Sequence, residues 1–132
     1  MVLTISRAAI DEILRAAAAS PDAEICGLLL GGPGEVTEVR PCANVAADPA
    51  DSFEIDPMAL IAAHKAARNG GPSLVGHYHS HPRGPASPSA RDAAMAEPGS
   101  YWIIIGDGEA RCWRARADGR FDPVNLSDHR NP

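Results

Sequence analysis

The sequence predicts an α/β fold in which a mixed β-sheet is flanked by helices, and three observations support this prediction. Helical and strand-like patterns alternate along the 132 residues, as they do in proteins that pack helices on a sheet. Short segments rich in Gly and Pro separate these patterns. Gly106-Asp107-Gly108 is a strong hairpin signal between two apolar runs. We expect a single domain over residues 1–132, which is long enough to bury a core without cross-links.

The first half of the chain predicts one helix followed by strands. Ser6 is a suitable N-cap for a helix over 7–19, and this helix has one apolar face. That face is formed by Ile10, Ile13, Leu14 and Ala17. The apolar run 24–31 predicts a buried strand, because Pro21 and a Gly-Gly-Pro segment bound it. We further expect a strand over 35–41, a loop over 43–52 and a short strand over 53–55.

The second half predicts two helices and four strands. Asp56-Pro57 has the pattern of an N-cap followed by proline at the first helical position, and the helix that begins there stops at Gly70. We expect Leu60, Ile61 and His64 to lie on one face of this helix. A strand over 73–79 precedes a proline-rich loop and a short helix over about 89–96. Strands over 101–105, 110–115 and 120–126 complete the chain.

Composition excludes several classes of protein. The formal net charge is −5 and no basic cluster is present, which argues against nucleic acid as a partner. The N-terminal segment carries charges and has no long apolar run, so we expect neither a signal peptide nor a membrane partner, and a cytoplasmic location. Cys26, Cys42 and Cys112 are odd in number and lack C-x-x-C spacing, so we expect free thiols rather than disulfides.

The segment around His79 and His81 predicts a metal site. Side chains alternate along a strand, so these two histidines project from the same face, with α-carbons roughly 6.5 Å apart. Asp92 offers a third, anionic ligand from the first turn of the predicted short helix, and its side chain would lean back toward the strand end. Two histidines, one aspartate and an open fourth position are typical of a catalytic rather than a structural metal site.

Two further polar residues are candidates for chemistry. Ser89 lies three residues before Asp92, on the same helical face. Glu24 stands at the start of an apolar strand, where a charge is costly unless it has a partner or a function, so it is a candidate acid/base. From the residues alone, a charge at the strand entry that is exposed to solvent is the more common interpretation of such a Glu.

The other histidines have simpler interpretations. His77 lies on the same strand face as His79 and could be a ligand, but it is further from the loop, so we interpret it as a packed histidine. We expect His64 on a helix face and His129 in the C-terminal tail. Pairs of histidines two residues apart also occur by chance, so the metal prediction depends on Asp92 and Ser89 as well.

These residues together resemble the JAMM motif of the MPN+ metalloproteases, in the minimal prokaryotic form of that family. The motif is a Glu, then His-Ser-His, then the seven residues from Pro82 to Pro88, then Ser-x-x-Asp. Glu-Ile-Cys-Gly-Leu-Leu-Leu-Gly around Glu24, together with Asn44 and Phe53-Glu-Ile-Asp-Pro57, resembles the surrounding family sequence. The likeness extends from the first helix to about Trp113.

The resemblance implies a fold similar to that of cytidine deaminases and a set of roles. It implies that His79, His81 and Asp92 bind one zinc ion with a catalytic water, that Glu24 handles the proton of that water, and that Ser89 helps to stabilise the oxyanion. It also implies a peptidase or isopeptidase that hydrolyses the amide bond after the C-terminal Gly-Gly of a ubiquitin-like or sulfur-carrier protein. The substrate protein, the leaving amine and the oligomeric state are left open.

Two rival functions are weaker. A zinc deaminase would need a P-C-x-x-C segment, which the sequence lacks. A non-catalytic binding module of the same family is the main alternative, but every motif residue is present here. Metal analysis separates the alternatives, because a scaffold need not hold stoichiometric zinc.

Overall fold

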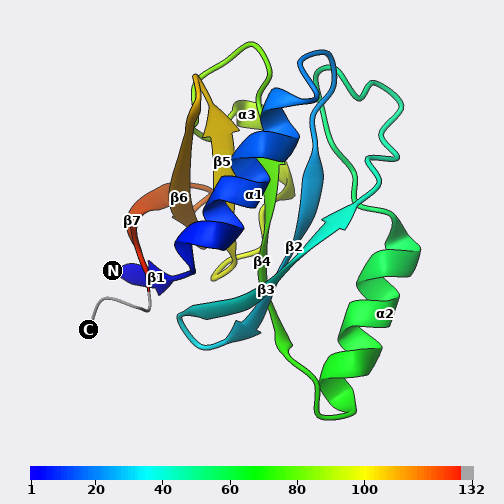
Figure 1. The fold of residues 1–132 in the computed structure, drawn as a ribbon, viewed down its shortest axis with the longest axis vertical. Helices are drawn as coiled ribbons and strands as arrows, with labels where there is room; N and C mark the ends of the chain where they lie inside the picture. The colour runs from blue at the N-terminus through cyan, green and yellow to red at the C-terminus, as the bar shows by residue number, and fades with distance from the viewer. Residues whose placement is uncertain (129–132) are drawn as a thin grey trace.

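A computed structural model describes residues 1–128 and shows strands from both halves of the chain joined in one sheet (Figure 1). The strands are β1 (Val2–Thr4), β2 (Cys26–Gly32), β3 (Glu35–Cys42), β4 (Ser73–Ser80), β5 (Tyr101–Gly106), β6 (Glu109–Ala115) and β7 (Phe121–Ser127). The helices are α1 (Arg7–Ala18), α2 (Pro57–Arg68) and α3 (Ala90–Met95). The predicted α/β fold with a mixed sheet and flanking helices is confirmed. His129 lies outside the described residues.

The sheet closes on itself in the order β1-β3-β2-β4-β5-β6-β7. Strand β1 makes this closure, because it runs parallel to both β3 and β7. Strands β4 and β5 are also parallel, and the remaining neighbours are antiparallel. The sequence did not predict β1, since three residues are too few to show a period of two.

Two apolar clusters lie on opposite faces of the central strands. Leu29, Tyr78 and Ile103 belong to the cluster beneath α1. Leu28, Trp102 and Ile104 belong to the cluster beneath α2 and the segment that precedes it. The alternation of neighbouring residues between clusters follows from the strand period, and it explains why both faces of β2 and β5 are apolar.

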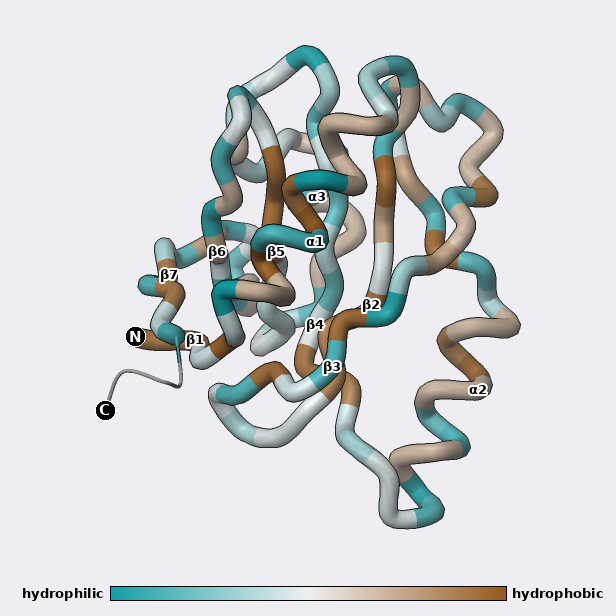
Figure 2. The backbone as a smooth tube through the Cα atoms, in the orientation of Figure 1, coloured by the Kyte–Doolittle hydropathy of each residue, from teal (hydrophilic) through white to brown (hydrophobic). Residues whose placement is uncertain are grey.

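The two long helices meet the sheet differently. All four predicted contact residues of α1 lie in or against the first cluster, as expected. In α2 the contact residues are Ala59, Leu60 and Ala63. Ile61 and His64 do not pack against the core with Leu60: both are exposed, Ile61 at 59%. An α-helix turns by about 100° per residue, so Ile61 points away when Leu60 and Ala63 pack inward. Figure 2 shows α2 to one side of the strands, with hydrophilic and hydrophobic residues alternating along it.

Several boundaries differ from the expected ones near the ends of the strands. The predicted strand over 53–55 is reduced to a single bridge between Asn44 and Ile55. The hairpin signal is confirmed, since Asp107 and Gly108 have φ values of 51° and 77°, as a type I′ turn requires.

The three cysteines are free, and Cys26 and Cys112 are buried. No helix within residues 1–128 is long and apolar enough to cross a bilayer.

Candidate metal centre

The C-terminal end of β4 brings His79 and His81 together. His79 is fully buried, while His81 follows the last strand residue, and their Nε2 atoms lie 3.1 Å apart. The ring of His79 stacks on Phe53 with a centroid distance of 4.3 Å and meets the edge of Trp102 at 5.4 Å. These apolar contacts fix the ring and direct its Nε2 atom toward His81.

Asp92 meets both histidines from α3. Its Oδ1 lies 3.2 Å from Nε2 of His79, and its Oδ2 lies 3.2 Å from Nε2 of His81. A capping box orients this carboxylate: the Ser89 hydroxyl accepts from the Asp92 amide at 3.0 Å, and Oδ2 of Asp92 accepts from the Ser89 amide at 2.9 Å. The structure therefore brings the three predicted metal ligands to one point.

The tautomer of His81 is set by the proline-rich loop. Its Nδ1 lies 2.9 Å from the carbonyl oxygen of Pro85, to which only an N–H can donate. The other nitrogen, Nε2, faces Asp92, and in the neutral ring it then carries no hydrogen, as a metal ligand requires. The loop is seated on β5, since the His81 amide donates to the Ile105 carbonyl at 2.7 Å. Gly106 contacts the loop backbone at Pro85 so closely that a larger residue would displace it.

Glu24 lies just before β2 and not at its first position, which corrects the sequence prediction. The Glu24 amide donates to the Pro49 carbonyl at 2.8 Å instead of joining the ladder. The Asn44 side chain donates to the carbonyls of Glu24 and Ser52, both at 3.0 Å, which clamps this segment to the loop before α2. Sequence reasoning assigned no role to Asn44. Its amide reaches carbonyls on two separate segments, which no local pattern reveals.

The Glu24 carboxylate faces the two histidines. A carboxylate oxygen of Glu24 and one ring nitrogen each of His79 and His81 all lie within 4.8 Å of one another. The Glu24 residue is only 7% exposed. Burial raises the pKa of Glu24 to about 7, and nearby Asp92 adds to this effect while His81 opposes it. A carboxyl group with such a pKa can both accept and deliver a proton near neutral pH.

The charges of the three predicted ligands are tightly coupled. Burial lowers the pKa of His79 despite the adjacent Asp92 carboxylate. Burial also opposes a charge on His81, but contacts with Asp92 and the Pro85 carbonyl outweigh it, so the pKa of His81 is raised. Burial alone would raise the pKa of Asp92, but its bonds to both histidines hold that pKa well below its usual range. The site is therefore prepared for a cation.

The donor set fits a divalent metal of intermediate softness. Two imidazole nitrogens and a carboxylate are ligands that zinc takes, and a second carboxylate lies beside them. Ser89 is the N-cap of α3 and sits next to Asp92. No contact of the Ser89 side chain with either histidine is seen within residues 1–128, so its proposed oxyanion role stays a prediction.

His77 stays apart from this group, as the sequence favoured. Its ring meets Trp102 edge-on at 4.1 Å and Phe53 at 5.5 Å, and burial lowers its pKa to about 4. His64 is exposed on α2. The packing roles of Phe53 and Trp102 around the metal ligands were not predicted, because they arise from segments that are distant in sequence.

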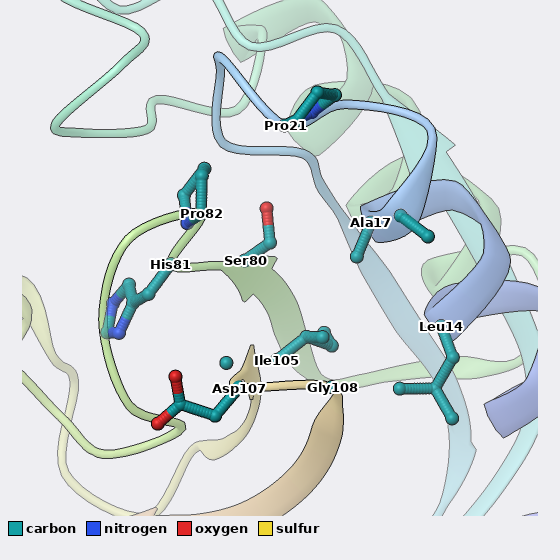
Figure 3. Close-up of a pocket in the computed structure, with 11 residues that line it drawn as sticks. Leu14, Ala17, Pro21, Ser80, His81, Pro82, Ile105, Asp107 and Gly108 are labelled. Atoms are coloured by element: carbon teal, nitrogen blue, oxygen red, sulfur yellow. The ribbon is translucent and has the colours of Figure 1, made fainter.

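A cavity of about 320 Å³ opens beside His81 (Figure 3). It lies between the end of α1, the end of β4 and the β5–β6 turn. Figure 3 shows His81 and Asp107 on one side of this space, with Leu14 and Ala17 on the other. A mostly apolar cavity next to a metal ligand can hold part of an extended substrate.

Comparisons with known sequences identify related proteins. A family model described as prokaryotic homologs of the JAB domain matches residues 6–116. The chain is 38% identical over 109 residues to a desampylase of Haloferax volcanii, covering 77% of this chain and 78% of that protein. It is 41% identical over 85 residues to a probable TtuB-protein conjugate cleaving protease of Thermus thermophilus, covering 64% of this chain and 57% of that protein.

Solved structures share the fold. A solution structure of a protein from Desulfitobacterium hafniense matches with a TM-score of 0.78 and 30% identity, over 97% of this chain and 94% of that chain. A structure described as a JAMM metalloprotease-like zinc site in the proteasome and signalosome matches with a TM-score of 0.59 and 21% identity, over 97% of this chain and 100% of that chain. The second likeness shows the fold alone.

Proposed function

The chain belongs to the family of prokaryotic homologs of the JAB domain, and from this premise we propose that it is a zinc-dependent peptidase or isopeptidase acting on conjugates of ubiquitin-like proteins. One observation carries the proposal. His79, His81 and Asp92 converge on one point with Glu24 beside them. Relatives named desampylase and TtuB-protein conjugate cleaving protease support the substrate class.

Zinc is the metal we propose for this centre. His79 and His81 would each present Nε2, and Asp92 would present a carboxylate oxygen, which leaves a position open to substrate. A zinc ion held there supplies a Lewis acid and lowers the pKa of a bound water. The description of a structural relative as holding a metalloprotease-like zinc site supports this choice.

Glu24 is the proposed acid/base. Its carboxylate lies beside the two histidines and can accept a proton from the attacking water. The same carboxyl group then delivers the proton to the departing amine, which has to leave in neutral form. Ser89 is proposed to donate its hydroxyl hydrogen to the developing oxyanion while its oxygen remains the N-cap of α3.

The substrate we propose is the extended C-terminal tail of a ubiquitin-like or sulfur-carrier protein that ends in Gly-Gly. The cavity beside His81 supports this, because it is mostly apolar and adjacent to a proposed metal ligand. A tail without side chains next to the scissile bond can enter where a folded chain cannot. The location of the protein in the cytoplasm stays a prediction.

Hydrolysis of a defined conjugate tests the proposal. Zinc-loaded protein is incubated with ubiquitin-like carriers that bear a C-terminal peptide or a lysine-linked target, and the products are read by intact mass. We expect cleavage after Gly-Gly, with losses of at least about 100-fold in Asp92→Ala and Glu24→Gln. Glu109→Gln, an exposed change on β6, is the matched control.

The outcomes separate the candidate functions. Wild-type protein that binds stoichiometric zinc but cleaves no such conjugate would contradict the proposed substrate. Protein that binds carriers without zinc and without cleavage would instead identify the non-catalytic module. Activity that survives in both Asp92→Ala and Glu24→Gln would exclude the proposed machinery.

A further inference from the structure

His77 is a partly buried histidine that the proposed reaction does not use. It lies two residues before His79 on the same face of β4. The rings of Trp102 and Phe53 contact both histidines, with centroid distances between 4.1 and 5.9 Å across this cluster. Trp102 cannot serve as a donor to them, because its Nε1 donates to the Ser100 hydroxyl at 3.1 Å. The aromatic rings that surround the two imidazoles therefore offer their Nδ1 atoms no hydrogen bond.

Two nitrogens in this environment lack partners. Within residues 1–128, the buried side-chain nitrogen and oxygen atoms without a hydrogen-bond partner are Nδ1 of His77 and Nδ1 of His79. A buried polar atom left unpaired costs about 1–3 kcal/mol, so two on neighbouring residues need an explanation.

The proposed metal centre determines what His79 requires. When Nε2 of His79 faces the metal, the single hydrogen of the neutral ring is on Nδ1. Metal-bound histidines almost always donate the hydrogen of their other ring nitrogen to a carboxylate, a backbone carbonyl or a water. His81 does so to the Pro85 carbonyl, whereas His79 has no such protein acceptor in the described chain.

We propose that His77 is a positioning residue for His79, accepting through one water molecule the hydrogen bond that Nδ1–H of His79 donates. This inference rests on the metal centre of the proposed function. Residues two apart on a strand have α-carbons roughly 6.6 Å apart, and one water can link nitrogens up to about 6 Å apart. A cavity of about 450 Å³ is lined by His77, Gly76 and Leu28, so His77 borders a space that water can fill.

The inference predicts opposite effects on folding and on metal binding. Phenylalanine at position 77 fits an aromatic cluster and removes one unpaired polar group, so the metal-free protein should keep or gain stability. The same change removes the acceptor for His79, so zinc affinity should fall by about 10–100-fold. A merely structural histidine would give the reverse: lower stability and unchanged affinity.

The experiment compares wild type with His77→Phe, His77→Asn and His64→Phe. Asparagine places a polar oxygen near the position of Nδ1 and should restore part of the affinity. His64 is exposed on α2, which makes His64→Phe the matched control. Zinc affinity is measured by competition with a chromophoric chelator, and the stability of metal-free protein by urea unfolding. Nitrogen-15 NMR of the zinc-loaded protein should show a slowly exchanging Nδ1–H on His79 that exchanges rapidly in His77→Phe.

Each contrary result overturns the inference. These results are wild-type zinc affinity in His77→Phe, no recovery in His77→Asn, or marked destabilisation of the metal-free Phe variant. Wild-type protein that binds no zinc would overturn both this inference and the zinc centre. Wild-type protein that binds zinc tightly but cleaves no conjugate would overturn only the proposed substrate.

Discussion

At the scale of single residues, burial and neighbouring charge decide what each group in the site can do. Asp92 stays ionised because two histidines contact its oxygens, although it is only 4% exposed. Glu24 has the opposite balance: burial dominates and its pKa is raised to about 7. Two carboxylates at one site are thus suited to the different roles we propose for them, one as a metal ligand and one as a proton carrier.

Glu24→Gln should stabilise the metal-free protein at alkaline pH. The pKa of Glu24 is raised from 4.5 to about 7, so its favourable contribution is present below about pH 4.5 and is lost as pH rises through 7. Above pH 7 the variant should therefore be more stable by roughly 1–2 kcal/mol, a value reduced for partial solvation. The measurement is urea unfolding of both proteins at pH 4.5 and pH 8.5.

Glu109→Gln on β6 is the control and should show no such pH-dependent difference. Equal stability of wild type and Glu24→Gln at both pH values would contradict the buried position of this carboxylate.

At the scale of elements, the end of one strand and the start of one helix meet to form the site. Strand β4 ends at the histidines, and α3 begins with the capping box that holds Asp92. The proline-rich loop between them is short and is bonded to β5 through His81. Proline limits the freedom of the unfolded loop, so less entropy is lost when the ligands come together.

Variants of Ser89 separate its capping role from its proposed catalytic role. Ser89→Ala removes an N-cap and should lower the free energy of unfolding by about 1 kcal/mol, whereas Ser89→Gly should lose only a few tenths. Both changes remove the hydroxyl, so both should reduce kcat by about 10-fold or more if it stabilises the oxyanion. Urea unfolding and steady-state kinetics measure the two effects.

Ser89→Thr keeps a hydroxyl and serves as the rescue control. A glycine variant with wild-type kcat would limit Ser89 to capping α3, because its hydroxyl would then have no part in the reaction.

At the scale of the whole molecule, a closed sheet collects ligands from separate segments. Glu24 precedes β2, His79 lies in the last part of β4 and Asp92 lies in the first turn of α3. The antiparallel pairing of β2 with β4 places Cys26 opposite His79, which brings Glu24 near the histidines. A ligand that joins these segments favours the folded state over the unfolded chain.

Zinc should therefore raise the thermal stability of the protein, and its removal should lower it. At a free zinc concentration a thousand times Kd, the added stability is about 4 kcal/mol, which corresponds to a rise in Tm on the order of 10 °C. Calorimetry with and without a chelator measures this shift. Asp92→Ala should show little of it, and an equal shift in that variant would place the metal elsewhere.

The sequence by itself determined the local elements and the identity of the chemical groups. Periodicity, capping residues and the Asp107-Gly108 turn were sufficient for three helices and most strands, since these signals depend on neighbouring residues. Strand β1 and the exposed position of Ile61 were not predictable in this way. Strand β1 forms by pairing with β3 and β7, which are distant in sequence. The exposure of Ile61 depends on which face of α2 packs against the sheet.

Only the tertiary structure decided how the site is assembled. Spacing indicated His79, His81 and Asp92 as metal ligands, but it left the role of Glu24 undecided. The pKa and the role of a carboxyl group near a strand depend on the residues that bury it. The Asn44 clamp, the Pro85 carbonyl and the aromatic rings around His77 and His79 come from segments far apart in the chain. Sequence patterns record residues that are neighbours along the chain, whereas pKa values and metal geometry depend on neighbours in space.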